Sequence, residues 1–235
     1  MVIPVYDEAD NIVELVREVR STLEGRLRYE ILVVDDGSRD DTVARLRAYR
    51  GGAGTPVRIL RHRTNAGQSA ALCSGVRAAR AEWIATLDGD GQNDPADIPA
   101  LYARTGDPTL AAICGQRVRR NDDLLRRLSS RIANGVRARV LHDATPDTGC
   151  GLKLIRRTVF MQLPWFDHMH RFIPALVQQA GYRTESVPVS HRPRLHGRSK
   201  YGIGNRLWVG LGDLAGVAWL GRRRWRTQCD EVDPQ

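Results

Sequence analysis

The sequence has little lysine and few aromatic residues. Only two of its 36 basic residues are lysines, Lys153 and Lys200, so the formal net charge of +9 comes almost entirely from arginine. Phe, Trp and Tyr make up 6% of the chain and gather in its last third, which argues against a nucleic-acid-binding surface of interleaved basic and aromatic side chains. The positive charge still favours anionic partners, such as phosphorylated substrates or an anionic membrane surface.

Long apolar runs and closely spaced cysteines are also missing. The longest candidate for a membrane span, residues 207–220, falls short of the roughly 18 residues required and contains Asp213. The first residues resemble a strand and lack the basic flank and apolar core of a signal peptide. The cysteines, at 73, 114, 150 and 229, do not have the spacing of zinc sites or redox pairs. These absences predict a cytoplasmic protein with buried, reduced thiols.

Apolar periodicity predicts alternating strands and helices in the first 90 residues. Strand-like runs fall at 1–5, 30–34, 57–60 and 83–87, and helical patterns at 12–23, 41–50 and 70–81. This alternation predicts one principal α/β domain, with a mostly parallel sheet that binds its ligands beyond the carboxyl ends of the strands. Further along, we expect helices at 96–104, 124–141 and 172–180, and strands at 111–115 and 152–155.

An acidic segment follows the fourth predicted strand. Asp88-Gly89-Asp90-Gly91-Gln92 offers two carboxylates one residue apart and an amide oxygen, which are ligands that suit Mg²⁺ or Mn²⁺. A leaving diphosphate needs such a cation because it departs with negative charge. Asp-Gly-Asp alone is equally compatible with a turn or a calcium loop. The ends of the other strands therefore decide its interpretation.

Four segments, in order along the chain, resemble the family-2 glycosyltransferases with the GT-A fold. They are Ile3-Pro4-Val5-Tyr6-Asp7-Glu8, Val33-Val34-Asp35-Asp36-Gly37-Ser38, Asn65-Ala66-Gly67-Gln68 and Leu87-Asp88-Gly89-Asp90-Gly91-Gln92. Within the family the resemblance is to the polyprenyl-phosphate transferases of the dolichol-phosphate mannosyltransferase type, and it extends over most of residues 2–202. One departure is Asp7, where the family commonly has Asn; we expect it to be tolerated.

The resemblance implies a Rossmann-like GT-A fold with its catalytic domain at residues 1–200. It implies inverting transfer of a hexose from a nucleotide diphosphate sugar, GDP-mannose or a UDP-sugar, to polyprenyl phosphate. The residues that it places at the nucleotide sugar are Pro4, Tyr6, Glu8, Asp36, Asp88, Asp90 and Gln92. Among them, Asp90 and Gln92 are the expected ligands of Mg²⁺ or Mn²⁺.

Basic residues of the later half indicate a phosphate acceptor. The resemblance places Arg117, Arg131, Arg194 and Lys200 around the phosphates, and Asp90, Arg117 and Lys200 are the predicted catalytic residues. Arg131 equally suits an ordinary arginine on a helix surface. A phosphate monoester is largely dianionic at pH 7, so transfer to it requires no general base. The alternative is a family-2 transferase that acts on a carbohydrate hydroxyl.

The C-terminal segment, residues 201–235, combines apolar residues and tryptophans with an arginine cluster at 222–226. This pattern favours an amphipathic helix at the surface of an anionic membrane. The alternative is a terminal helix packed on the core of the domain, and six glycines between 202 and 221 weaken either helix. We expect a peripheral contact at the cytoplasmic face of a membrane. His168 and His170 resemble a segment near the acceptor, and their spacing is a poor match to a zinc site.

Overall fold

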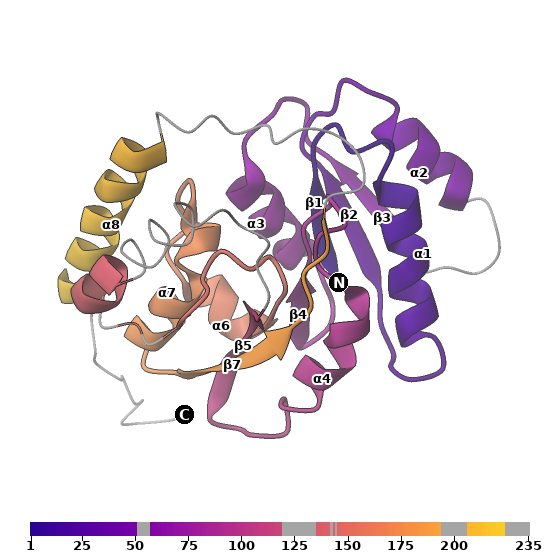
Figure 1. Ribbon diagram of the computed structural model, residues 1–235. Helices are drawn as coiled ribbons and strands as arrows, with labels where there is room; N and C mark the ends of the chain where they lie inside the picture. The colour runs from indigo at the N-terminus through magenta and orange to yellow at the C-terminus, as the bar shows by residue number, and fades with distance from the viewer. Residues whose placement is uncertain (51–56, 119–134, 142, 144, 194–205, 224–235) are drawn as a thin grey trace, which may run out of the picture.

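The computed structural model describes residues 1–50, 57–118, 135–141, 143, 145–193 and 206–223 (Figure 1). Within these ranges a 7-stranded sheet has the order β3-β2-β1-β4-β6-β5-β7. Its strands are β1 (Val2–Val5), β2 (Ile31–Asp35), β3 (Val57–Arg61), β4 (Trp83–Thr86), β5 (Leu110–Arg117), β6 (Lys153–Arg156) and β7 (Arg183–Val189).

The sheet is mostly parallel, as the alternation predicts. Strand β6 runs antiparallel to β4 and β5, whereas the other pairs of neighbours are parallel. From β1 the chain proceeds outward through β2 to β3 and then returns to the other side of β1 to form β4. The strand order therefore reverses between β1 and β4, and ligands of open α/β sheets bind at such a reversal.

Helices cover both faces of the sheet (Figure 1). Three helices, α1 (Ile12–Leu23), α2 (Thr42–Arg50) and α4 (Ile98–Tyr102), contribute to one apolar cluster. The opposite cluster contains α3 (Gln68–Ala78), α6 (Arg157–Gln162) and α7 (Ile173–Gln179). Two 3-10 turns, η1 (Pro95–Asp97) and η2 (Met169–Arg171), complete these layers, and residues 135–141 are helical.

Most of the predicted elements are confirmed, although residues 124–134 of the predicted helix 124–141 lie outside the described residues; α6, β7 and η2 were not predicted. In α1 the buried residues Ile12, Leu15, Val16, Val19 and Leu23 all belong to the face that the periodicity identified. Helix α6 has only six residues, too few for a clear period. Strand β7 begins Arg183-Thr184-Glu185-Ser186, a polar run that a strand adopts here because it lies at the edge of the sheet.

The last described helix, α8 (Arg206–Arg223), lies at the end of the molecule opposite α1 and α2 (Figure 1). Its Val217 is buried, whereas Leu211 and Trp219 are exposed. None of the helices in the described ranges is long and apolar enough to cross a membrane.

Three of the cysteines are free and buried: Cys73, Cys114 and Cys150. Burial raises the pKa of Cys73 to about 11 and that of Cys114 to about 12. Both thiols are therefore protonated at neutral pH. The expected burial of these three thiols is confirmed, while Cys229 lies outside the described residues.

Candidate active site

The carboxyl ends of β1, β2 and β4 meet at one edge of the sheet. The backbone N–H of Asp36 donates to the Val5 carbonyl at 2.8 Å, which joins the first two strands where they end. A Cβ added to Gly89 would lie 2.6 Å from Cγ1 of Val5 and 3.1 Å from the carbonyl oxygen of Pro4. The predicted residues Pro4, Asp36 and Asp88 are thus brought to a common site by three separate strands.

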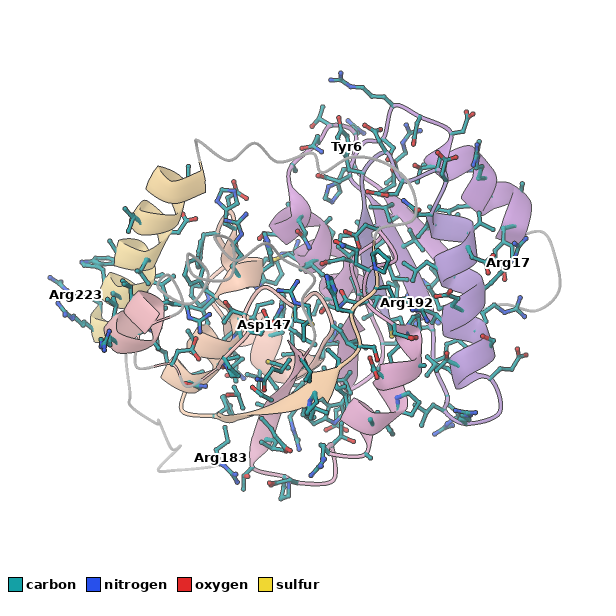
Figure 2. All side chains as sticks on the ribbon, viewed as in Figure 1. Tyr6, Arg17, Asp147, Arg183, Arg192 and Arg223 are labelled. Atoms are coloured by element: carbon teal, nitrogen blue, oxygen red, sulfur yellow. The ribbon has the colours of Figure 1, made fainter. Side chains whose placement is uncertain are left out.

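The loop after β1 is fixed by the start of α2. The N–H of Asp7 donates to Ser38 Oγ at 2.9 Å, and the Asp7 carboxylate accepts the Arg39 N–H at 2.7 Å. The N–H of Glu8 donates to Thr42 Oγ1 at 2.9 Å. Tyr6 lies in this loop, at the strand-end edge of the molecule (Figure 2).

Asp36 holds the backbone that enters α3. Its carboxylate accepts the N–H groups of Ala66 at 2.9 Å and Gly67 at 2.7 Å, and it pairs with His62 Nδ1 at 2.7 Å. The next residue, Gln68, donates its side-chain amide to Asp88 Oδ1 at 2.8 Å. A short network therefore runs from the end of β2, through the first turn of α3, to the acidic segment after β4.

The acidic segment forms a tight turn with two neighbouring carboxylates. The Gln92 N–H donates to Asp90 Oδ1 at 3.1 Å, and Gly91 has a φ of +72°, which favours glycine. Burial and the negative charge of Asp90 raise the pKa of Asp88 to about 6, although Lys153 and Arg117 act in the opposite direction. Asp88 thus lies close to a second carboxylate and to two basic side chains.

Asp88 is also packed against the chain that precedes β6. A Cβ added to Gly151 would lie 2.3 Å from the Asp88 carboxyl carbon, so only glycine fits at this position. Lys153 is buried, and its Nζ donates to the Cys150 carbonyl. Lys153 was not among the predicted site residues. A lysine inside an apolar strand, in a chain with only two lysines, was the available signal.

Arg117 is held in one orientation by Asp147. Its Nε and a terminal nitrogen donate to the two carboxylate oxygens at 2.7 and 2.8 Å, and both side chains are largely buried. Asp147 lies centrally in the molecule (Figure 2). Arg137 forms an ion pair with Asp143 at 3.3 Å and so anchors the stretch of chain that leads to Asp147. Asp147 was not among the predicted site residues, because nothing in a turn-rich stretch identifies which charge it faces.

The remaining predicted residues divide into two groups. Arg131, Arg194 and Lys200 lie outside the described residues. His170 Nδ1 lies 2.8 Å from Ser69 Oγ in the first turn of α3, next to Gln68, whereas His168 Nδ1 faces Asp213 of α8 at 3.1 Å. Within the described ranges, no three His, Cys, Asp or Glu side chains come together as a metal site.

The strand order, the helices on both faces and the acidic turn after β4 define a Rossmann-like GT-A fold. A family model described as glycosyl transferase family 2 matches residues 1–163. The chain therefore belongs to glycosyl transferase family 2.

Two curated relatives are similar over most of the chain. The dodecaprenyl-phosphate galacturonate synthase of Rhizobium johnstonii is 38% identical over 230 residues, which cover 96% of this chain and 68% of the relative. The undecaprenyl-phosphate 4-deoxy-4-formamido-L-arabinose transferase of Edwardsiella ictaluri is 34% identical over 204 residues, which cover 86% of this chain and 62% of the relative. The chain thus spans about two thirds of the length of each.

Solved structures support the fold. The glucosyl-3-phosphoglycerate synthase of Mycobacterium tuberculosis in complex with UDP has a TM-score of 0.72 at 17% identity, with 93% of this chain and 79% of that chain covered. Its complex with Mn²⁺, UDP-glucose and glycerol 3-phosphate has a TM-score of 0.66, also at 17% identity, with 94% and 78% covered. At this identity the likeness establishes the fold alone.

Proposed function

We propose that the chain carries the catalytic unit of an inverting glycosyltransferase that moves a hexose from a nucleotide diphosphate sugar to polyprenyl phosphate. The observation that carries this proposal is the acidic turn at the reversal point between β1 and β4, where Gln68 and Gly151 confine Asp88. The names of both relatives specify a polyprenyl phosphate, which supports the acceptor. GDP- and UDP-linked sugars both remain candidates as the donor.

The oxygen ligands that this turn offers fit a hard divalent cation. Asp90 supplies a carboxylate and Gln92 an amide oxygen, the ligand types that Mg²⁺ and Mn²⁺ prefer. Burial and the second carboxylate disfavour the charge of the neighbouring Asp88, which an added cation would offset. A bound Mg²⁺ or Mn²⁺ would neutralise charge on the departing diphosphate. The mycobacterial synthase of the same fold was crystallised with Mn²⁺ and a nucleotide sugar.

The protein contributes position and charge to the reaction. Pro4, Tyr6, Glu8 and Asp36 lie on the strand ends and loops proposed to hold the nucleotide. An acceptor phosphate oxygen forms a bond to the anomeric carbon while the bond from that carbon to the diphosphate oxygen breaks, and the electron pair leaves with the nucleoside diphosphate. The products are a polyprenyl phosphosugar of inverted configuration and the free nucleoside diphosphate.

The proposed transfer to a phosphate requires no general base. The acceptor phosphate is already anionic at neutral pH and needs only its charge balanced. Arg117 suits this role because Asp147 fixes the plane of its guanidinium, so little side-chain entropy is lost on binding. Arg131, Arg194 and Lys200 remain proposed phosphate ligands by resemblance.

Replacing Asp90 tests the metal and donor assignment. We expect Asp90→Ala to abolish Mn²⁺-dependent binding of UDP and GDP, measured as a rise in melting temperature, because the variant removes a ligand. Asp90→Asn keeps the shape of the side chain and removes its charge, and it should lose most of the same effect. Asp107→Ala, at the exposed far end of the sheet, serves as the control. Unchanged Mn²⁺-dependent binding in Asp90→Ala would contradict the assignment.

The chemical nature of the product tests the acceptor. Incubation with radiolabelled GDP-mannose or UDP-sugars and undecaprenyl phosphate should place the label in an organic-extractable, mild-acid-labile product. Label found only in a water-soluble glycoside would instead indicate transfer to a carbohydrate hydroxyl. The assay requires Mg²⁺ or Mn²⁺ in the buffer, and omission of the metal is its negative control.

The proposal includes a peripheral contact with the cytoplasmic face of a membrane through α8. The exposed face of this helix contains Leu211, Ala215 and Trp219 and ends at Arg222 and Arg223. A cavity of about 420 Å³ between α6, α7 and α8 extends this apolar surface, and it is lined by Leu163, Leu176, Trp219 and Leu220. Exposed apolar residues beside arginines are typical of helices that lie on anionic lipid.

A further inference from the structure

Arg192 joins two parts of the chain that are far apart in the sequence. Its guanidinium donates to both carboxylate oxygens of Glu18 in α1, at 3.0 and 2.9 Å. The other side of the same group pairs with Asp94 Oδ2, at 3.1 Å from Nε and 2.6 Å from NH2. Figure 2 shows Arg192 beside α1.

The backbone around Arg192 binds the end of the acidic turn. The N–H of Arg192 donates to the Gln92 carbonyl at 2.8 Å, and His191 forms an isolated antiparallel bridge with Asn93. Two residues earlier, the Ser190 N–H donates to the Asp97 carboxylate at 2.7 Å. The segment that follows β7 therefore runs along residues 92–97 and contacts them through backbone and side chain.

Asp94 connects this contact to the start of η1. One of its carboxylate oxygens accepts the Ala96 N–H at 2.9 Å and caps the 3-10 turn, while the other accepts from Arg192. The acidic turn thus has a fixed point at the end of β4 and another at Asp94. Between them lies Gly91, whose backbone is intrinsically permissive.

The ion pairs of Arg192 are expected to stabilise the local conformation of the chain. Isolated surface ion pairs, such as Arg17–Glu14 with both side chains 58% exposed, are worth little. Arg192 differs because one guanidinium bridges two carboxylates: one terminal nitrogen donates to both Glu18 oxygens, and Nε and the other terminal nitrogen both face one Asp94 oxygen. The side-chain exposures are 37% for Arg192, 32% for Glu18 and 20% for Asp94. A network in which one guanidinium joins two partly buried carboxylates is the kind of surface contact that contributes to stability.

We infer that Arg192 is a positioning residue for the donor site: it acts through Asp94 and the Gln92 carbonyl to hold Asp90 and Gln92 in the conformation that binds metal and diphosphate. This inference rests on the proposed function of the acidic turn. Arg192 itself does not contact the reacting atoms. Its effect therefore falls on the affinity for metal and nucleotide more than on the chemical step.

Hydrogen exchange of the protein without metal tests whether Arg192 holds residues 88–97, independently of the proposed function. In Arg192→Gln, peptides that cover residues 88–97 should exchange about tenfold faster, because the loss of a forked charged contact allows local opening. Glu18→Gln should show a smaller increase. The control is Arg183→Gln at the start of β7, which removes a more exposed arginine pair with the single carboxylate of Asp107 and should leave exchange in residues 88–97 unchanged. Unaltered exchange in both Arg192→Gln and Glu18→Gln would overturn the inference.

Binding and kinetics then test the link to the donor site. Titration of MnCl₂ in the presence of UDP or GDP should give about fivefold weaker apparent metal affinity in Arg192→Gln, with a larger change in KM for metal than in kcat. Arg192→Lys should recover part of the affinity, since a single ammonium replaces the fork. Faster exchange with unchanged metal affinity would overturn the positioning role. A wild-type protein without metal-dependent nucleotide binding would overturn the proposed function. The exchange result would still decide whether Arg192 holds residues 88–97.

Discussion

Asp7 adopts a left-handed backbone conformation with a φ of 50°. Asn and Asp are the non-glycine residues that accept this conformation most readily, which explains why Asp can stand where the family commonly has Asn. Its carboxylate also accepts the N–H of Arg39 and so ties the loop after β1 to the loop after β2. The expected tolerance of this departure thus has a physical basis.

Gly151 offers a residue-scale prediction. Gly151→Ala adds a Cβ at 2.3 Å from the Asp88 carboxyl carbon, so the carboxylate must move. We expect Mn²⁺-dependent nucleotide binding to weaken about tenfold and the free energy of unfolding to fall by about 1–3 kcal/mol, as for other overpacked sites. Isothermal titration and chemical denaturation measure the two effects. Gly106→Ala, where an added Cβ meets nothing within 4 Å, is the control. Equal behaviour of the two variants would show that Asp88 does not need this space.

At the scale of elements, α8 is tied to the loop before η2. His168 has a φ of 61°, and its Nδ1 lies 3.1 Å from Asp213 Oδ2 in α8. Two residues later, His170 contacts Ser69 in the first turn of α3. The segment between α6 and α7 therefore contacts both α3 and α8. Neither contact follows from sequence spacing, since 45 and 101 residues separate the partners.

Removing the carboxylate of Asp213 tests this attachment. In Asp213→Asn we expect faster amide exchange in α8 and unchanged exchange in the strands, because the variant removes the pair with His168 and leaves the apolar packing of Val217 and the contact of Gln179 to the Val217 carbonyl. Hydrogen exchange with mass spectrometry resolves the two regions. Glu14→Gln, which breaks an exposed helix pair in α1, is the matched control. Protection of α8 equal to that of the wild type would mean that the pair with His168 does not hold the helix.

At the scale of the whole molecule, the proposed site and α8 lie in different parts of the fold. The strand ends of β1, β2 and β4 form the site, and α8 forms the outer end beyond α7 (Figure 1). Trp219 is 58% exposed, and the guanidinium carbon of Arg223 lies 5.7 Å from its ring centroid. Arg223 lies at the end of α8 (Figure 2). The apolar face of α8 and its cationic end therefore point away from the described core.

Vesicle binding tests that face. We expect the protein to sediment with vesicles of phosphatidylglycerol and phosphatidylcholine, and less with phosphatidylcholine alone, because the arginines attract anionic headgroups. Trp219→Ala combined with Leu211→Ala should reduce binding about tenfold by removing the two exposed apolar side chains. Tyr102→Ala, an exposed aromatic residue on α4, is the control. Binding that survives the double substitution would place the contact elsewhere.

The sequence by itself determined the β-α-β alternation and the acidic turn, because buried strands and helix faces leave a local apolar period. It also determined the family, through four short segments near strand ends. The tertiary structure alone decided which distant groups share the site: Gly151 and Lys153 beside Asp88, Asp147 on Arg117, and Arg192 on the acidic turn. Those contacts depend on how β6 and β7 fit into the sheet. Pairing across a sheet joins residues without any fixed spacing along the chain.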